Sequence, residues 1–451
     1  MQRAGDTGDA ATSAGRSSGA AAAACAAGLF VIAFAVVLAT RATNQRALFD
    51  QDVYHLRAIR TFAQQWPRPD FHDYASATTP LYHLLIALVD RYVTDSVTAL
   101  RVVGATFTVG MLATLGWVVG RRISVPGAVA LCLPVVTSLY TFPSGAWLLP
   151  DNAGWWGVIV ILAIALDGRF TRRTYIAAAI ALLALVLVRQ VHLWCAGVLV
   201  FAAWLGTGDD ADRAASSASR YTRVLAMLAA SVPAAIAVGA FMLIWRGPMP
   251  PSMAEAIRNG YVPAEAGVRI SGPNWATPGA VLVIAGITGV FFTPILLPAI
   301  RAGRVGARWL LVGAAMGLAI GAAPHSSYEF GTRSGGFWNA IHALPTFADR
   351  SPAFIALAAL GGAVLAAWAQ ALDRRDAWIL AAAYGCFVLS QLPNPSAFQR
   401  YFEPFVLIVC ALAASRIASR DGAPRFAWAG PVALALLLGA VTALSLAPAG
   451  G

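Results

Sequence analysis

The sequence predicts an all-α integral membrane protein, a polytopic bundle of helices that forms a single membrane domain. Two observations predict this class. The 451 residues are 59% hydrophobic and only 12% charged, and their mean hydropathy of +0.67 is too high for a soluble domain of this length. Apolar runs of about 20 residues also recur along the chain, and such a run crosses a bilayer as a helix that satisfies its own backbone hydrogen bonds.

The apolar runs divide the chain into about 11 to 13 expected spans, because a few of the shorter runs could be tilted or partly buried pieces. Residues 1–18 precede them as a small, polar tail that we expect to be disordered, and residues 19–451 form the membrane domain. No obvious cleavage site follows the first run, which indicates a signal anchor rather than a removed signal peptide. The expected spans are 19–40, 97–120, 124–141, 153–167, 174–189, 191–206, 224–245, 279–299, 309–323, 352–372, 377–392, 402–415 and 427–447.

Every basic residue is Arg, and the arginines gather in every second connection between the spans. Because arginine-rich connections stay in the cytoplasm, the pattern places the N-terminus and these connections on that side. The formal net charge of +11 therefore reflects membrane orientation and not binding to nucleic acid. The Lys-free, Ala-rich composition is typical of a high-GC bacterium, so we expect a bacterial plasma membrane. The arginine-bearing segments are 1–18, 121–122, 167–173, 206–223, 301–308, 373–376 and 416–425.

The remaining connections, on the extracytoplasmic side, hold most of the polar and aromatic residues outside the spans. The first is long, at 41–96, and two more are of medium length, at 246–278 and 324–351. Long loops of this kind on one membrane face are where binding or chemistry is expected. Repeated Pro and Gly at the start of 246–278 predict an ordered lid, and Trp338 offers a flat face that could stack on a sugar ring.

The stretch "FDQDVYHLRAI" (49–59) places two acids and a histidine just beyond the first span. Helical spacing of apolar residues predicts an amphipathic helix over 50–65. Asp50 could simply cap this helix, and Asp52 could lie in its first turn. A carboxylate that is partly desolvated at a membrane surface is also more basic, which suits it to remove a proton from a hydroxyl. His55 lies one turn from Asp52, where it could bind a phosphate or orient the acid.

A second segment of the first outer connection, "TTPLYHLLIALVDRYV" (78–93), predicts another short helix. We expect Thr78 or Thr79 as its N-cap and Pro80 at its first helical position. The helix is too short to span, so both helices of this connection are expected to lie on the outer membrane surface.

Residues 52–85, "DVYHLRAIRTFAQQWPRPDFHDYASATTPLYHLL", resemble the first lumenal loop of the dolichyl-phosphate-glucose glucosyltransferases, a family of the GT-C superfamily. "LVRQVHLW" (187–194) is similar to a second stretch of that family, with Val191 and His192 in place of its Thr-Asn pair, and "FQRYFEP" (398–404) is similar to a third. The Thr-Thr-Pro element lacks the Pro-Gly that follows it in the family. The matching positions are Asp52, Tyr54, His55, Thr78, Thr79, Pro80, Leu81, Tyr82, Arg189, Gln190, Trp194 and Arg400.

The resemblance implies a GT-C-like bundle that transfers a hexose, with inversion, from a polyprenyl-phosphate donor to a hydroxyl of a glycan or glycolipid on the extracytoplasmic face. Asp52 is the expected base, with Asp50 as the alternative. A phosphate leaving group needs positive charge, for which Arg189, Arg400, His55 and His192 are the candidates. No cofactor is required, although the acid-x-acid pair could hold a divalent cation. The candidates on the acceptor side are Tyr54, Thr79, Tyr82, Asp151 and Trp338.

Three other classes of protein compete with this hypothesis: a transporter or flippase for a lipid-linked sugar, an oligosaccharide ligase or polymerase, and a non-catalytic scaffold. Transporters place ionisable groups inside their spans near the midplane. The spans expected here are almost free of acids, and the polar groups crowd one face. This pattern favours an enzyme.

Overall fold

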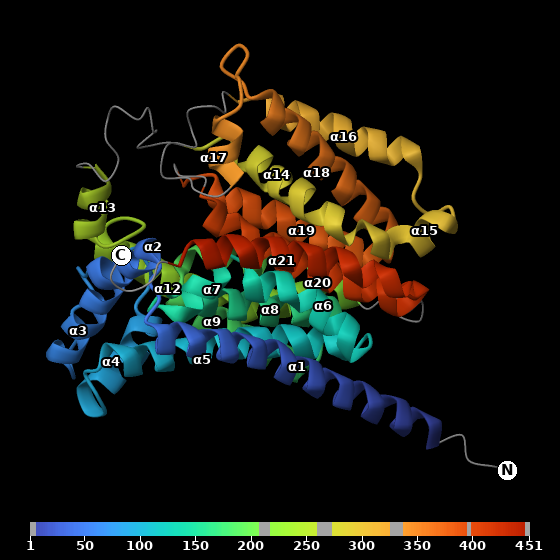
Figure 1. Cartoon of the computed structure of the whole chain (residues 1–451). Helices are drawn as coiled ribbons and strands as arrows, with labels where there is room; N and C mark the ends of the chain where they lie inside the picture. The colour runs from blue at the N-terminus through green and yellow to red at the C-terminus, as the bar shows by residue number, and fades with distance from the viewer. Residues whose placement is uncertain (1–5, 207–216, 259–272, 325–336, 395–397, 447–451) are drawn as a thin grey trace.

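The computed structural model describes residues 6–206, 217–258, 273–324, 337–394 and 398–446, and it contains helices but no strand in these ranges. Long helices run side by side through the bundle, and α1 extends along one side of it (Figure 1). Each of the 13 expected spans coincides with helical structure. The corresponding elements are α1 (Asp6–Thr40), α5 (Val97–Gly120), α6 (Val125–Thr137), α8 (Asp151–Asp167), α9 (Arg172–Val188), η2 (Gln190–Trp194) with α10 (Cys195–Leu205), α12 (Ser217–Trp245), α14 (Thr277–Gly289) with η4 (Val290–Leu296) and α15 (Leu297–Arg301), α16 (Ala307–Ala322), α18 (Pro352–Ala371), α19 (Arg374–Gln391), α20 (Gln399–Asp421), and η5 (Arg425–Trp428) with α21 (Ala429–Leu444).

Seven helical segments of the described chain are long and apolar enough to cross a membrane, and three shorter apolar helices accompany them. The chain is therefore an all-helical, multi-pass membrane protein. Helices such as α8 and α9 have 17 residues each, which corresponds to about 26 Å of rise, less than the roughly 30 Å hydrocarbon core. That the six other expected spans also cross the membrane stays a prediction. The seven segments are Gly15–Thr40, Val97–Gly120, Ser219–Trp245, Thr277–Arg301, Pro352–Ala371, Gln399–Asp421 and Arg425–Leu444.

The arginine-rich connections meet at one end of the bundle, as their alternation along the chain requires. Arg420 pairs with Asp373 across two of these connections, and Arg304 pairs with Asp421 at 2.5 Å. The Nε of Arg375 donates to the carbonyl oxygen of Gly206 at 2.6 Å. We call this the arginine-rich end. Its assignment to the cytoplasm is a prediction from charge alone.

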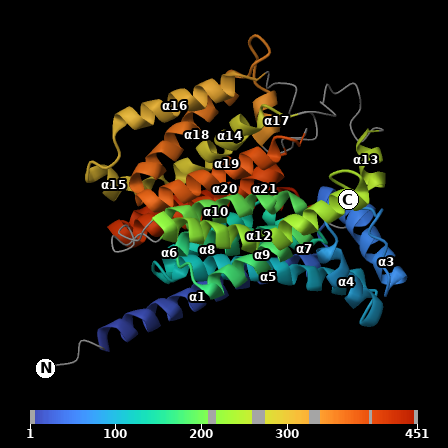
Figure 2. The same cartoon turned by 180° about the vertical axis from the view of Figure 1, so that it is seen from behind.

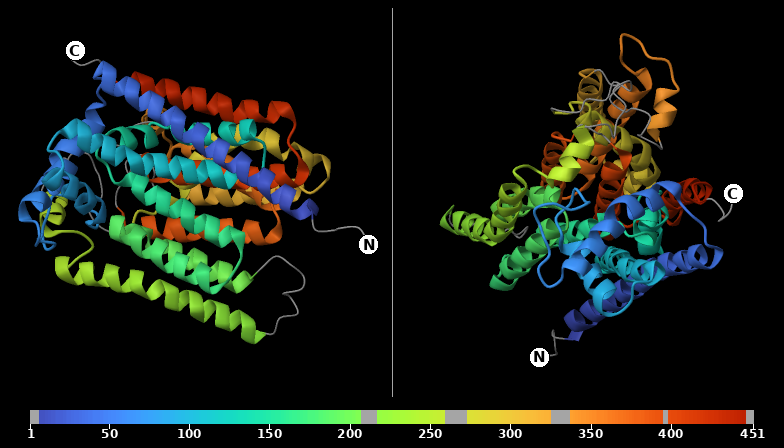
Figure 3. Two further views of the ribbon diagram at one scale, coloured as in Figure 1. Left: turned by 90° about the horizontal axis from the view of Figure 1, so that it is seen from below. Right: turned by 90° about the vertical axis from the view of Figure 1, so that its left-hand side faces the viewer.

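The first outer connection folds at the opposite end of the bundle, beside the end of α12 (Figures 2 and 3). Its helices share a small core of their own with α5 and α12, whose members include Leu56, Ile59, Phe62, Tyr74, Tyr82 and Trp245. These contacts make the connection a packed structure and not a pair of helices lying loosely on a surface. The elements at this end are α2 (Gln45–Asp50), η1 (Gln51–His55), α3 (Leu56–Gln65), α4 (Leu81–Tyr92), α7 (Thr141–Ala146), α13 (Pro251–Arg258) and α17 (Phe337–His342).

Helices α14, α18 and α16 pack through glycines. A Cβ on Gly361 of α18 would overlap the carbonyl group of Leu282 on α14, and one on Gly317 of α16 would overlap that of Ala358 on α18. Small residues let membrane helices approach to backbone contact, where dispersion and packing hold them together.

A Gly361→Val substitution is therefore expected to force α14 and α18 apart and to lower the free energy of unfolding by about 2–3 kcal/mol, the upper range for overpacking. The measurement is thermal unfolding of the detergent-solubilised protein. Gly239→Val on α12 is the matched control, because a Cβ there meets no atom within 4 Å. Equal melting temperatures for the two variants would contradict the packing argument.

Candidate functional site

The segment that carries the acids begins earlier than the sequence predicts. Its helix starts at Gln45 because the Asn44 side chain accepts a hydrogen bond from the Ala47 amide, so Asp50 does not cap it. Residues Gln51–His55 form a π-helical turn, in which the Leu56 amide donates to the carbonyl oxygen of Gln51. Such wide turns insert one extra residue into a helix and often occur at functional sites.

Asp50 and Arg400 form an ion pair between two distant parts of the chain. Their side chains meet at 2.5 Å, with 16% of Asp50 and 28% of Arg400 exposed. Arg400 lies in the first turn of α20, so the pair joins the first outer connection to the start of a buried helix. A partly buried pair is screened less by salt than an exposed one.

Asp151 and Arg189 form a second, similarly buried ion pair. Asp151 is the first residue of α8 and makes no capping bond. Arg189 lies between α9 and η2, and its backbone is extended there. Its side chain is mostly buried and points inward instead of snorkelling to the membrane interface. Burial alone would raise the pKa of Asp151, but the guanidinium groups of Arg189 and Arg400 outweigh burial and lower it.

Two aromatic rings bring the two pairs together. The guanidinium carbons of Arg400 and Arg189 lie 5.1 and 5.8 Å from the ring centre of Tyr401. On the other side, Arg46 and Arg400 lie 5.6 and 5.9 Å from the ring of Phe398. Three guanidinium groups thus alternate with two aromatic rings. The attraction between each guanidinium and the ring faces stabilises this arrangement. The sequence prediction did not include Arg46, Phe398 or Tyr401, although both rings flank Arg400 in "FQRYFEP".

Each of the two central arginines retains a buried donor without a partner. Asp50 binds Nη1 of Arg400, and Asp151 binds Nη1 of Arg189. The Nε atoms of both arginines are buried and make no hydrogen bond within the described part of the chain. A buried donor that is left unpaired costs stability, and a ligand with acceptor oxygens would satisfy these two atoms. Charge-assisted bonds from arginine to phosphate oxygens meet this requirement.

Asp52 lies on the same π-helical turn but is exposed and outside the ion pairs. Its Oδ1 accepts a hydrogen bond from the Gln51 amide at 2.8 Å. Gln51 is itself held by the backbone amide of Leu148, which donates to its Oε1 at 3.4 Å. The carboxylate of Asp52 is therefore positioned by a neutral group, and it interacts electrostatically with Arg101 instead of pairing with Arg400 or Arg189. Because residues two apart on a helix do not face each other, Asp50 and Asp52 point in different directions.

His55 pairs with His83 and not with Asp52 as expected. His55 Nδ1 and His83 Nε2 are 3.0 Å apart, and the rings stack at 5.2 Å between centres. Burial and then the positive charges of Arg400 and Arg189 lower the pKa of His55 to about 3. The ring is therefore neutral near pH 7, and His55 can serve a phosphate only as a neutral hydrogen-bond donor.

The depressed pKa of His55 predicts that acid weakens the fold. Below about pH 6.5 the unfolded chain binds a proton that folded His55 does not accept, so stability is present above that pH and is lost as the pH falls toward 3. The melting temperature should fall between pH 7.5 and 5, and less steeply in His55→Gln. His72→Gln, in the same connection and exposed, should keep the original slope. An unchanged slope in His55→Gln would contradict the assignment.

Three of the residues expected on the acceptor side are buried or half-buried among other side chains. Thr79 is fully buried, and its hydroxyl donates to the carbonyl oxygen of Val186 at 2.6 Å instead of capping α4. Helix α4 starts at Leu81, with Pro80 in the cap position. Tyr82 is also buried, with its hydroxyl against Gly104. Tyr54 is half-buried and edge-on to Phe49 at 6.0 Å.

The structure does not describe the side chain that was expected to form the aromatic platform in the loop 324–351. Trp338 belongs to α17, and its side chain lies outside the part of the chain that the structure describes. Its proposed stacking on a sugar stays a prediction.

Gln190 holds the outer connections against the bundle. Its Oε1 accepts from the Thr79 amide at 3.1 Å, and its Nε2 donates to the carbonyl oxygens of Ala77 and Pro248 at 2.8 and 3.0 Å. The backbone amide of Ser252 donates to Asp73 at 3.0 Å. The start of the expected lid, 246–258, is thus docked onto the first connection, whereas 259–272 lie outside the described residues.

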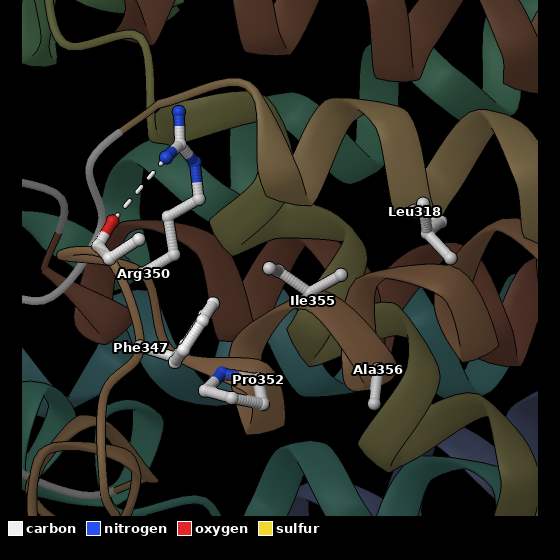
Figure 4. A pocket seen from close by; sticks show the side chains of 7 residues that line it. Leu318, Phe347, Arg350, Pro352, Ile355 and Ala356 are labelled. Carbon is white, nitrogen blue, oxygen red and sulfur yellow. Dashed lines mark hydrogen bonds between the residues drawn. The ribbon is translucent and has the colours of Figure 1, made fainter.

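The described residues contain no group of three or more His, Cys, Asp or Glu side chains that could hold a metal ion. A groove of about 450 Å³ lies elsewhere, between α16 and the start of α18. Figure 4 shows its apolar lining beside Arg350, whose side chain donates to the carbonyl oxygen of Ala348 at 3.4 Å. The groove contains none of the residues of the two ion pairs.

Comparisons with protein-family models, with curated proteins and with solved structures find no match for this chain. The resemblance to the GT-C superfamily therefore stays a prediction from the quoted motifs.

Proposed function

We propose that this protein is a membrane glycosyltransferase of the GT-C type, which transfers a hexose from a polyprenyl-phosphate donor to a hydroxyl of a glycan or glycolipid. One observation carries the proposal. The pairs Asp50–Arg400 and Asp151–Arg189 meet around Tyr401, and the Nε atom of each arginine is a buried donor without a partner. Such donors favour a phosphate at the end of the bundle where the outer connections fold.

The reaction assigned to these residues is a single displacement. Asp52 takes the proton of the acceptor hydroxyl, whose oxygen forms a bond to the anomeric carbon of the sugar. The bond between that carbon and the phosphate oxygen breaks, and its electron pair leaves with the polyprenyl monophosphate. Arg400 and Arg189 stabilise the negative charge that gathers on the phosphate, so the leaving group requires no proton.

The two acids receive different roles. Asp50 already binds Arg400, so its carboxylate is occupied by an ion pair. Asp52 accepts one bond from a neutral amide and keeps its second oxygen for a proton. Asp52 is therefore the base in this proposal, and Asp50 orients the Arg400 guanidinium.

The test uses membranes from cells that overproduce the protein, supplied with radiolabelled polyprenyl-phosphate glucose, mannose or galactose. We expect label to move from the lipid extract into a product with one of these donors. Membranes that contain an Arg189→Gln, Arg400→Gln variant at equal abundance are the control. Equal label transfer in both preparations, or none with any donor, would reject the proposal. Label that crosses the bilayer on its original lipid would instead support a transporter.

A further inference from the structure

His192 is a buried histidine whose protonation is fixed by its neighbour. It is 2% exposed, and the indole nitrogen of Trp194 approaches its Nδ1 at 3.3 Å. An indole N–H can only donate, so Nδ1 must be the acceptor and the ring proton must reside on Nε2. A second proton on Nδ1 would oppose the indole N–H, which keeps the ring neutral.

The Nε2 donor of His192 is buried without a partner in the described part of the chain. A Cβ added to Gly154 would lie 2.9 Å from this Nε2 and 3.2 Å from Cδ of Arg189. The glycine thus lets the ring and the arginine approach the same turn of α8, one turn inside Asp151. Trp155, the next residue, packs edge-on to the His192 ring with 5.1 Å between centres.

Two side chains with unpartnered donors therefore meet beside Gly154: His192, which approaches through Nε2, and Arg189, which approaches through the Cδ atom bonded to its Nε. Asp151 binds Nη1 of Arg189 and does not compete for its Nε. One donor is charged and the other is neutral, and buried donors require acceptor oxygens.

We propose that Gly154, His192 and Arg189 form an oxyanion subsite, in which neutral His192 donates from Nε2 to a phosphate-ester oxygen that Arg189 binds through Nε. This inference rests on the proposed phosphate site and adds a binding residue whose action depends on its tautomer. Trp194 acts indirectly, as the positioning residue that sets that tautomer.

Binding is measured by calorimetry with geranyl phosphate in detergent, and geraniol and inorganic phosphate serve as probes of the lipid and the anion alone. His192→Leu removes one hydrogen bond to the anion, so the affinity for geranyl phosphate should fall about 10- to 100-fold. His192→Gln, whose amide can donate from a similar position, should stay within about threefold. Gly154→Ala should weaken binding because its methyl group would press on Nε2 of His192 and on Cδ of Arg189, the atom next to the Nε donor. Wild-type affinity in His192→Leu would overturn the subsite, as would stronger binding of geraniol than of geranyl phosphate.

A second readout addresses the tautomer. In protein labelled with ¹⁵N-histidine, the resonance lost in His192→Gln should report a neutral ring protonated on Nε2 near pH 7. Trp194→Phe should leave His192 as a mixture of its two neutral tautomers, and the affinity for geranyl phosphate should fall. An Nδ1-protonated or cationic ring in the wild type would overturn the inference. Binding that depends on His192 in a protein without transferase activity would retain the subsite and reject only the proposed function.

Discussion

Asp52→Asn is expected to lower sugar transfer by about 100- to 10,000-fold, the usual contribution of a general base. The amide keeps the shape of the side chain and its hydrogen bond with Gln51 after rotation, so the π-helical turn should persist. Asparagine cannot take a proton from the acceptor hydroxyl. Because Asp52 is exposed and makes no ion pair with Arg400 or Arg189, donor binding should change by less than about threefold.

The measurement is the initial rate of label transfer at saturating donor, together with geranyl phosphate affinity. Asp95→Asn is the matched control, since Asp95 is an exposed acid of the same connection and should retain full activity. A fully active Asp52→Asn variant would remove this residue from the mechanism. If Asp50→Asn alone abolished transfer with donor affinity intact, the roles of the two acids would be reversed.

The sequence predicts the helices well because the hydrophobic runs are long and their flanks are charged. Its 13 expected spans all coincide with helical structure. Whether each helix is long enough to cross the membrane is harder to predict, because hydropathy along the chain does not distinguish a spanning helix from a short helix buried among others. Thus α8, most of whose residues are buried, is not among the seven candidate spans.

The candidate site was only partly predictable. Asp50, Asp151, Arg189 and Arg400 were all selected from the sequence, Arg189 because an arginine at membrane depth is rare and usually functional. Their pairing was not, since Asp50 and Arg400 are 350 positions apart and no local pattern encodes such a contact. Local spacing instead suggested that Asp52 and His55 would act together. The partner of His55 is His83, which belongs to α4 and meets it only through tertiary packing.

Glu403 was not selected from the sequence, and its role also depends on contacts with distant segments. It follows Arg400 by one turn of α20 and is fully buried. Ser138 donates to one of its oxygens at 2.6 Å, and Gln399 donates to the other. The Oε1 of Gln399 accepts from the backbone amide of Phe337 at 2.8 Å. This chain of bonds fixes the turn that presents Arg400 and Tyr401, and two of its donors, Ser138 and the Phe337 amide, come from segments that are distant in sequence.

Arg400→Gln is expected to have the second large effect, on both stability and binding. Removing the guanidinium leaves the Asp50 carboxylate partly buried without its partner, which should lower the free energy of unfolding by about 2–3 kcal/mol, less than for a fully buried pair. It also removes one of the two cations proposed to hold the phosphate, so geranyl phosphate affinity should fall by about 10- to 100-fold. Single-variant data cannot separate these causes.

The double variant Asp50→Asn, Arg400→Gln separates them. With both charges removed, no unpaired carboxylate remains, and an Asn–Gln pair can hydrogen-bond, so thermal stability should recover most of the loss. Phosphate affinity should stay low because the cation is still absent. Recovery of stability without recovery of binding therefore indicates that Arg400 serves the ligand, whereas recovery of both would indicate that the Asp50–Arg400 pair only holds the first outer connection to α20.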